Sequence, residues 1–213
     1  MTDLSTIPLF PLQIVVFPGQ TVPLYVFEPR YRQMFAEVRA AEERGEVVQV
    51  GVILGQDSEM QASVGCTIEL RQVVTEYEDG RLEIVTEGAR RFRIDSIVEV
   101  KSYVEARVEY VEDEEESIDQ RLMERALAEF KRLVKLAREE TGTVAVEWTP
   151  TTTWQLAEAV AMGLEQRQQL LEMVSENERL QVLCDYFGQL SLVVEQRRQS
   201  RQQGSSNGYF SPN

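Results

Sequence analysis

The side chains that could do chemistry in this chain are few and widely spaced. Among its 213 residues the chain has no histidine, and its two cysteines are Cys66 and Cys184. The lack of histidine excludes Ser-His and Cys-His nucleophilic pairs as well as histidine metal sites. Two distant cysteines indicate neither a disulfide framework nor a CxxC metal site, which fits a reducing compartment such as the cytoplasm. We therefore expect no catalytic residue, no metal and no cofactor.

Two charged clusters could still bind a ligand. The acidic run "EDEEES" at residues 112–117 could hold a hard cation, but a run of like charges between structured segments is typical of a solvated linker. Arg90, Arg91 and Arg93 could form a nucleic-acid patch. Arg91 and Arg93 alternate with Phe92 and Ile94, however, which indicates the solvated face of a strand. A net charge of -14 also disfavours nucleic acid as a partner.

The elements that would position these residues begin with an apolar segment at residues 7–35 that carries five prolines. The prolines exclude a continuous helix, and the apolar runs are too short for a membrane span. Short strands at "IVVF" and "VPLYVF" are predicted instead, followed by a helix from Pro29 to about Gly45. Further strands follow, with a hairpin of type I′ at Asp79-Gly80. Residues 1–111 are thus predicted to form a compact β-rich lobe with one early helix.

A change of hydrophobic period near Ile118 predicts a second, helical lobe over residues 118–197. Residues 112–117 would be the acidic linker between the lobes. Capping boxes are expected at Thr152 with Gln155 and at Ser175 with Glu178. Residues 198–213 lack apolar periodicity and are predicted to be a disordered tail. The fold class is therefore α+β.

Three motifs in order connect this pattern with a known family. "PLFPLQIVVFPGQTVPLYVFEPRYRQMF", "VTEGARRFRI" and "LEQRQQLLEMVSENERL" resemble the substrate-binding N-terminal domain of Lon proteases. The resemblance covers the chain to about Arg197. It implies a PUA-like pseudo-barrel followed by a helical lobe, and a domain that recognises unfolded or damaged polypeptide for a separate unfoldase and protease.

The sequence also departs from a complete Lon protease. It has no GxxxxGK[ST] phosphate loop, and the Ser-Lys dyad of the family belongs to a module that this sequence does not contain. We therefore expect a stand-alone, non-catalytic polypeptide-binding module that works without ATP, as a substrate receptor, an adaptor or an assembly factor. Its partners would be unfolded polypeptide and a separate protease, unfoldase or assembly partner. An RNA-binding PUA-like protein and an unrecognised enzyme stay open as alternatives.

Aromatic and proline residues at predicted loop tips are the candidates for client binding. They are Phe17 and Pro18 at the "VVFPGQ" turn, and Tyr77 beside the Asp79-Gly80 hairpin. Rigid rings at loop tips make good binding anchors. The alternative for each is that its side chain folds back onto its own lobe.

Overall fold

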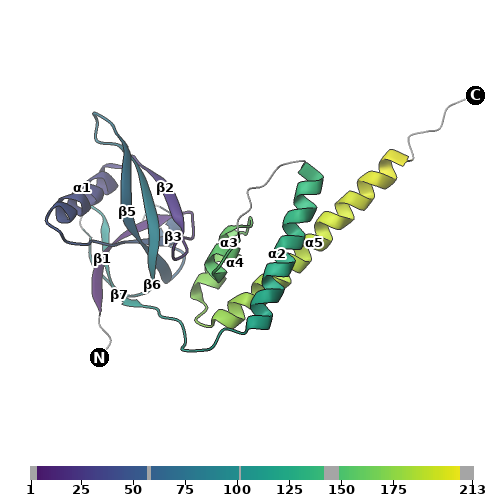
Figure 1. Ribbon diagram of the computed structural model, residues 1–213. Helices are drawn as coiled ribbons and strands as arrows, with labels where there is room; N and C mark the ends of the chain where they lie inside the picture. The colour runs from purple at the N-terminus through teal and green to yellow at the C-terminus, as the bar shows by residue number, and fades with distance from the viewer. Residues whose placement is uncertain (1–3, 57–58, 101, 142–148, 207–213) are drawn as a thin grey trace, which may run out of the picture. The chain divides into compact units, whose positions relative to one another are not determined.

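The structure is a computed structural model that describes residues 4–56, 59–100, 102–141 and 149–206 (Figure 1). The chain divides into two compact units. The first, called the β unit, comprises Met1–Asp113 and Ala157–Val174. The second, called the helical unit, comprises Glu114–Leu156 and Ser175–Asn213.

A seven-stranded sheet builds the β unit. Its strand order is β1-β7-β6-β5-β3-β4, and β2 pairs with β6 beside this path. Because β1 also pairs in parallel with β3, the strands β1, β7, β6, β5 and β3 close into a barrel. The strand bounds are β1 Ser5–Leu12, β2 Thr21–Val26, β3 Val50–Gln56, β4 Glu59–Met60, β5 Val64–Glu76, β6 Leu82–Val100 and β7 Val104–Tyr110. The predicted β-rich barrel is confirmed.

Apolar residues at alternate strand positions fill the barrel, as the pleat requires. Its core is a cluster of buried side chains from β1, β3, β6 and β7: Ile7, Leu9, Ile53, Phe92, Ala106 and Val108. Helix α1, Pro29–Glu43, covers a second part of this core. The ring centroid of Tyr31 lies 4.3 Å from that of Phe10. Proline at the first helical position and Gly45 after the C-cap, with a φ of 79°, bound α1 as the sequence predicts.

The predicted hairpin joins β5 to β6, but its turn differs by one residue from the predicted one. Gly80 N–H donates to the carbonyl of Tyr77, and Tyr77 N–H donates to the carbonyl of Arg81. Gly80 has a φ of 81°. This is the pattern of a three-residue loop with a glycine bulge, rather than a two-residue type I′ turn. Tyr77 therefore closes the loop.

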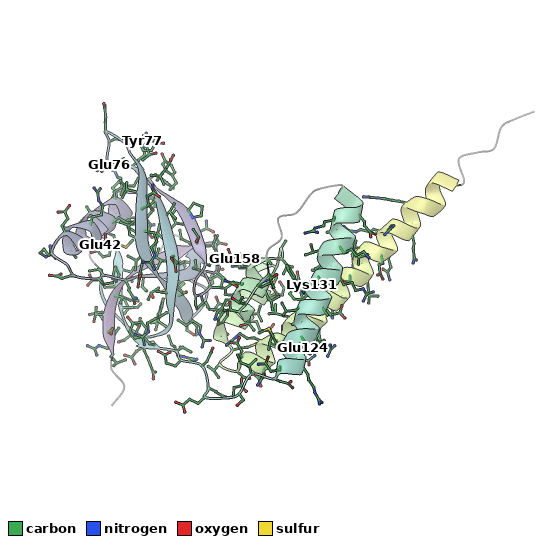
Figure 2. All side chains as sticks on the ribbon, in the orientation of Figure 1. Glu42, Glu76, Tyr77, Glu124, Lys131 and Glu158 are labelled. Carbon is green, nitrogen blue, oxygen red and sulfur yellow. The ribbon has the colours of Figure 1, made fainter. Side chains whose placement is uncertain are left out.

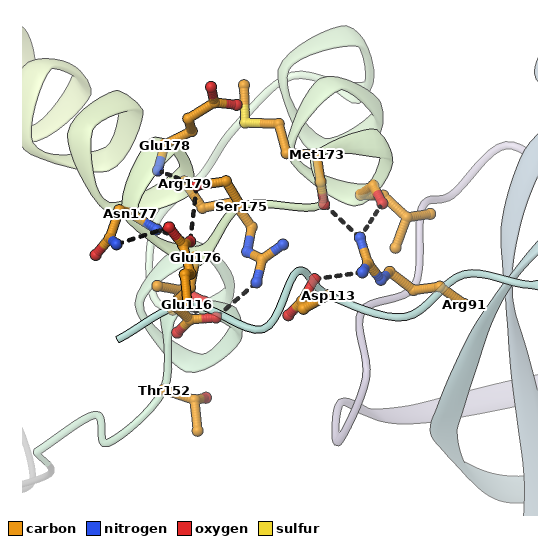
Figure 3. Close-up of polar contacts among 12 residues, drawn as sticks. Arg91, Asp113, Glu116, Thr152, Met173, Ser175, Glu176, Asn177, Glu178 and Arg179 are labelled. Atoms are coloured by element: carbon orange, nitrogen blue, oxygen red, sulfur yellow. Dashed lines mark hydrogen bonds and ion pairs between the residues drawn. The ribbon is translucent and has the colours of Figure 1, made fainter. Parts of the chain in front are cut away.

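Helix α4, Leu164–Glu172, belongs to the β unit, although the sequence analysis places it in the helical lobe. Arg91 of β6 is 4% exposed and donates to the carbonyls of Leu171 and Met173 at the C-terminal end of α4, and also to Asp113 (Figure 3). At the other end, Arg167 donates to the carbonyl of Val15 at 2.9 Å. These bonds join segments that are far apart in sequence, which no local pattern reveals.

The helical unit is centred on α2, Gln120–Thr141, and α5, Glu176–Ser206, while α3, Thr153–Glu158, spans the division between the units. Phe130 and Phe187 join α2 to α5 with ring centroids 5.8 Å apart. The fully buried Arg179 pairs with Glu176 at 2.6 Å and lies 4.3 Å from the centroid of the Trp154 ring.

The end of α5 differs from the predicted tail, which was expected to begin at residue 198. The helix continues to Ser206, because the arginine and glutamine residues there are good helix formers that extend an existing helix. Residues 207–213 of the predicted tail lie outside the described residues.

The acidic run is bonded to specific partners and is not simply a solvated linker. In the β unit, Glu112 pairs with Arg90 at 2.6 Å, and Asp113 pairs with Arg91. In the helical unit, Glu116 accepts hydrogen bonds from the Ser175 hydroxyl at 2.8 Å and from the backbone N–H of Asn177 at 3.1 Å (Figure 3). The division between the units therefore falls between Asp113 and Glu114.

The two predicted caps are formed by their hydroxyl groups. Thr152 Oγ1 accepts from Gln155 N–H at 3.2 Å, and Ser175 Oγ accepts from Glu178 N–H at 3.1 Å. The Gln155 side chain accepts from the N–H of Thr151.

Gly88 is predicted to tolerate no side chain. A Cβ there would lie 2.1 Å from the carbonyl oxygen of Phe17, whose backbone cannot move away without releasing the turn before β2. Gly88→Ala should lower the free energy of unfolding by about 1–3 kcal/mol or more. Gly188→Ala in α5, where a Cβ meets nothing within 4 Å, is the matched control and should raise it by up to about 1 kcal/mol. Urea denaturation measures both, and equal effects would contradict the assignment.

Glu116 should make folding of the helical unit pH-dependent. The backbone N–H of Asn177 and then the Ser175 hydroxyl lower the pKa of this carboxyl below its ordinary value. Its contribution to stability is therefore present above the ordinary pKa, and is lost as the pH falls through the lowered one. Glu116→Gln should lower the stability at neutral pH and have no effect in acid below that pKa. Glu115→Gln makes the same change of charge one residue away. The difference in stability between this variant and the unsubstituted chain should show no such dependence on pH in a series of denaturation experiments.

Candidate functional site

The structure places the predicted site residues at opposite ends of β2. Phe17 and Pro18 precede β2, whereas Tyr77 closes the hairpin near the other end, where Val26 pairs with Leu82. Phe17 is fully buried, and its ring lies 4.2 Å from the Arg167 guanidinium carbon. Pro18 is half-buried. Phe17 thus packs in the core, and its ring is not available to a client in this conformation.

Tyr77 lies beside two exposed rings that sequence analysis did not single out. The rings of Tyr25 and Phe27 stack with their centroids 5.8 Å apart, and the Tyr77 ring meets the Tyr25 ring edge-on at 6.3 Å. Tyr25 is 44% and Phe27 57% exposed, while Tyr77 is half-buried. We call Tyr25, Phe27 and Tyr77 the aromatic cluster. Figure 2 shows Tyr77 at the tip of the β5–β6 hairpin.

Arg81 fixes the geometry of the aromatic cluster. Its guanidinium carbon lies 5.0 Å from the Tyr77 ring centroid and 6.0 Å from that of Tyr25, and its Nη1 donates to the Tyr25 hydroxyl at 2.6 Å. Asp79 holds the same guanidinium at 2.7 Å. On the other side, the Tyr77 hydroxyl donates to Glu83 at 2.7 Å, and this hydrogen bond raises the pKa of Tyr77. The two tyrosine hydroxyls are therefore held in place while the ring of Phe27 is exposed.

A hollow of about 320 Å³ lies between α1 and the same hairpin. The Arg39 guanidinium and the Glu76 carboxylate form an ion pair in its wall, at 3.1 Å. Apolar side chains make up much of the rest, so the hollow suits one mixed side chain. Its lining residues are Pro29, Arg32, Gln33, Ala36, Arg39, Glu76, Gly80 and Leu82.

Cys66 and the acidic side chains are the remaining candidates for chemistry. Burial raises the pKa of Cys66 to about 12, which removes its thiolate at neutral pH. The described part of the chain holds no group of three or more acidic, cysteine or histidine side chains that could bind a metal. It also has no helix that is long and apolar enough to cross a membrane.

The three arginines that suggested a nucleic-acid patch have separate environments. Arg91 is buried, contrary to the solvated face that its alternation with Phe92 predicts, because it bonds to α4 and Asp113. Arg90 pairs with Glu112 and lies 3.8 Å from the centroid of the Tyr110 ring. Arg93 is exposed on β6. The three do not present one basic surface.

Comparison with known proteins decides the family. Residues 6–187 match the model of the ATP-dependent protease La (LON) substrate-binding domain. The chain belongs to the Lon substrate-binding domain family. Its sequence is 28% identical to the Lon protease of Halothermothrix orenii over 81% of this chain, and 26% identical to that of Escherichia coli over 92%. It spans only about a quarter of these relatives, 23% and 26% of their lengths.

Solved structures of Lon N-terminal domains have the same fold. The Lon N-terminal domain protein from Xanthomonas campestris superposes with a TM-score of 0.62 at 27% identity, over 85% of this chain and 98% of that one. The N-terminal domain of Mycobacterium avium complex Lon protease gives a TM-score of 0.64 at 23% identity, over 86% and 98%. The second likeness supports the fold alone.

A signal for the aromatic cluster was present in the sequence of β2. Pro23, Tyr25 and Phe27 occupy alternate positions, and all three are exposed, whereas the alternating residues Val22 and Val26 are buried and Leu24 is half-buried. Proline inside a strand is typical of an edge strand, whose outer face can be solvated. The sequence analysis predicts a short strand at this segment but does not assign its exposed face.

Alanine substitutions at Phe17 and at Phe27 should differ in their effect on stability, because Phe17 belongs to the core and Phe27 to the aromatic cluster. Phe17→Ala should lower the free energy of unfolding by about 3–5 kcal/mol, because it leaves a cavity beneath Arg167. Phe27→Ala should change it by no more than about 0.5 kcal/mol, because the ring is exposed. Chemical denaturation monitored by circular dichroism measures both values. A Phe27→Ala cost as large as that of Phe17→Ala would show that Phe27 is part of the core.

Proposed function

We propose that this chain is a non-catalytic polypeptide-binding module that receives unfolded or partly folded clients on its β unit. In this proposal the module is a substrate receptor, adaptor or assembly factor for a separate protease, unfoldase or assembly partner. The observation that carries the proposal is the aromatic cluster, which exposes apolar rings on a rigid sheet. Membership of the Lon substrate-binding domain family supports the same class of ligand.

The physical case rests on the exposure of the rings. Large aromatic side chains contribute most of the energy of many protein interfaces, and they lose little side-chain entropy on binding. Arg81, Asp79 and Glu83 hold the two tyrosines, so little further ordering is needed. Rings of this kind accept many apolar side chains, which suits a receptor for clients that share no sequence.

The expected affinity is modest. An unfolded client loses about 1–2 kcal/mol of backbone conformational free energy for each residue that it orders. A contact of a few residues with three rings therefore leaves a micromolar dissociation constant, which corresponds to about 8 kcal/mol. Weak binding also lets a client pass to another protein.

The environments of the arginines and the net charge of the chain argue against nucleic acid as a partner. Arg91 is buried, Arg90 is engaged by Glu112 and Tyr110, and the chain carries a net charge of -14. An enzyme needs converging polar groups in an enclosed pocket. The hollow beside the aromatic cluster is lined by Arg32, Gln33 and the Arg39–Glu76 ion pair together with apolar side chains, and its one carboxylate, that of Glu76, is held by Arg39.

Titration of an unfolded protein against the full chain tests the proposal. Reduced, carboxymethylated lactalbumin, which stays unfolded, should bind with a micromolar dissociation constant in fluorescence anisotropy, and native lactalbumin should bind much more weakly. The double variant Tyr25→Ser/Phe27→Ser should weaken the binding at least about tenfold, because two exposed anchors are removed.

Val47→Ser is the matched control for the double variant. Val47 is also an exposed apolar residue of the β unit, at 78%, but it lies in the connection between α1 and β3. It should leave binding unchanged. Equal affinity for folded and unfolded lactalbumin, or an equal loss with Val47→Ser, would contradict a receptor site at the aromatic cluster.

A further inference from the structure

Strand β2 forms an open edge of the sheet. Its six residues pair with β6, from Thr21 opposite Glu87 to Val26 opposite Leu82. In the described part of the chain, β2 pairs with no other strand. Its second row of backbone groups is therefore available for pairing, as on any unprotected edge strand.

The direction of these backbone groups follows from the hydrogen bonds at the start of the strand. Gly88 N–H donates to the carbonyl of Gln20, just before Thr21. Antiparallel partners alternate between bonded and non-bonded pairs. Val22, Leu24 and Val26 therefore bond to β6, and the backbone groups of Thr21, Pro23 and Tyr25 point to the open edge. Pro23, which has no N–H, fits a position that needs no bond to β6.

The side chains beside this edge alternate in the same way. Val22 and Val26 are buried, while Thr21, Pro23, Tyr25 and Phe27 are exposed. A strand added at the edge would place every second side chain on the exposed face, next to the rings of Tyr25 and Phe27. The open edge and the aromatic cluster therefore form one surface.

We propose that the edge of β2 binds an extended client segment as an added strand, and that this site selects segments with apolar or aromatic residues at every second position. This inference rests on the proposed polypeptide-binding function and names the conformation and pattern that the site recognises. Such alternation is typical of the half-buried strands of folded proteins, which become exposed when a protein unfolds. The client class is therefore unfolded β-strand segments.

An extended polypeptide is the occupant that matches the groups on the edge. Thr21 and Tyr25 each offer an N–H and a carbonyl, and Pro23 offers a carbonyl only. Another backbone in extended conformation supplies acceptors and donors at the same spacing. A second copy of this chain fits less well, because each copy carries a net charge of -14 and repels the other. The missing N–H at Pro23 interrupts the ladder and keeps the added strand weakly bound.

Backbone methylation of a peptide tests strand addition without changing its side chains. The probe is an acetylated, amidated six-residue peptide, Val-Ser-Phe-Ser-Val-Lys, equal in length to β2. Two methylated versions are compared. One carries N-methyl groups on the odd-numbered residues of the peptide, and the other carries them on the even-numbered residues. If the peptide adds as a strand, one version should lose about tenfold or more in affinity for the full chain, because its inward N–H groups are blocked. The other version should bind like the parent.

A protein variant tests the same edge from the other side. Thr21→Pro removes an outward N–H and leaves the bonds to β6 intact, so it should weaken binding of the parent peptide several-fold. Thr21→Ser keeps the N–H and should bind as the unsubstituted chain does. Circular dichroism checks that both variants are folded. A peptide of the same composition with its apolar residues adjacent should bind more weakly than the alternating one.

The outcomes separate this inference from the proposed function. If both methylated peptides bind like the parent while Tyr25→Ser/Phe27→Ser abolishes lactalbumin binding, strand addition is wrong and the receptor function stands. If neither the parent peptide nor unfolded lactalbumin binds, both fail. If the chain alone sediments as a dimer that Thr21→Pro dissociates, the edge is occupied by a second copy and the inference is overturned.

Discussion

The buried guanidinium of Arg91 is the interaction on which the architecture of the β unit depends. A charge taken out of water is tolerated only when it is paired and its donors are satisfied. Arg91 meets this condition by bonding to Asp113, where the first part of the β unit ends, and to two carbonyls at the C-terminal end of α4. A cation is also favourable at that end of a helix. The same side chain thus fixes both places where the chain leaves the β unit.

Fixing α4 also fixes the segment that leads into β2. Arg167, in the same helix, holds the carbonyl of Val15 and the side-chain oxygen of Gln20, and covers the ring of Phe17. Burial lowers the pKa of this guanidinium from its ordinary value, which shows how far it is removed from water. Gly88 lets the same turn approach β6 closely. The position of β2, and with it that of the aromatic cluster, therefore depends on a helix that follows it by more than a hundred residues in sequence.

Features set by local sequence were predictable, and features set by distant side chains were not. Pro29 and Gly45 bound α1 because helix ends are determined by nearby residues, and Thr152 and Ser175 cap their helices for the same reason. The resemblance to the Lon family was also visible in three motifs. The two carbonyls that accept from Arg91 at the end of α4 lie some eighty residues away in sequence, so alternation with Phe92 placed Arg91 wrongly on a solvated face. Phe17 was expected at an exposed loop tip because no residue near it in sequence indicates that Arg167 covers its ring. Tyr77 was singled out, but Tyr25 joins it only when β2 pairs beside the hairpin.

The proline in β2 reconciles two demands on an exposed sheet edge. An edge with apolar rings and a complete row of N–H and carbonyl groups would pair with any other edge, including that of a neighbouring copy, and such edges cause aggregation. A covered edge would be safe, but it would recognise nothing. Pro23 removes one N–H from the middle of the outward row without weakening the pairing with β6. An added strand of the kind proposed would then be too weakly held by backbone bonds alone, and it would need side chains that contact Tyr25 and Phe27. In the proposed site, selectivity for clients and protection from self-association would both follow from the same missing donor.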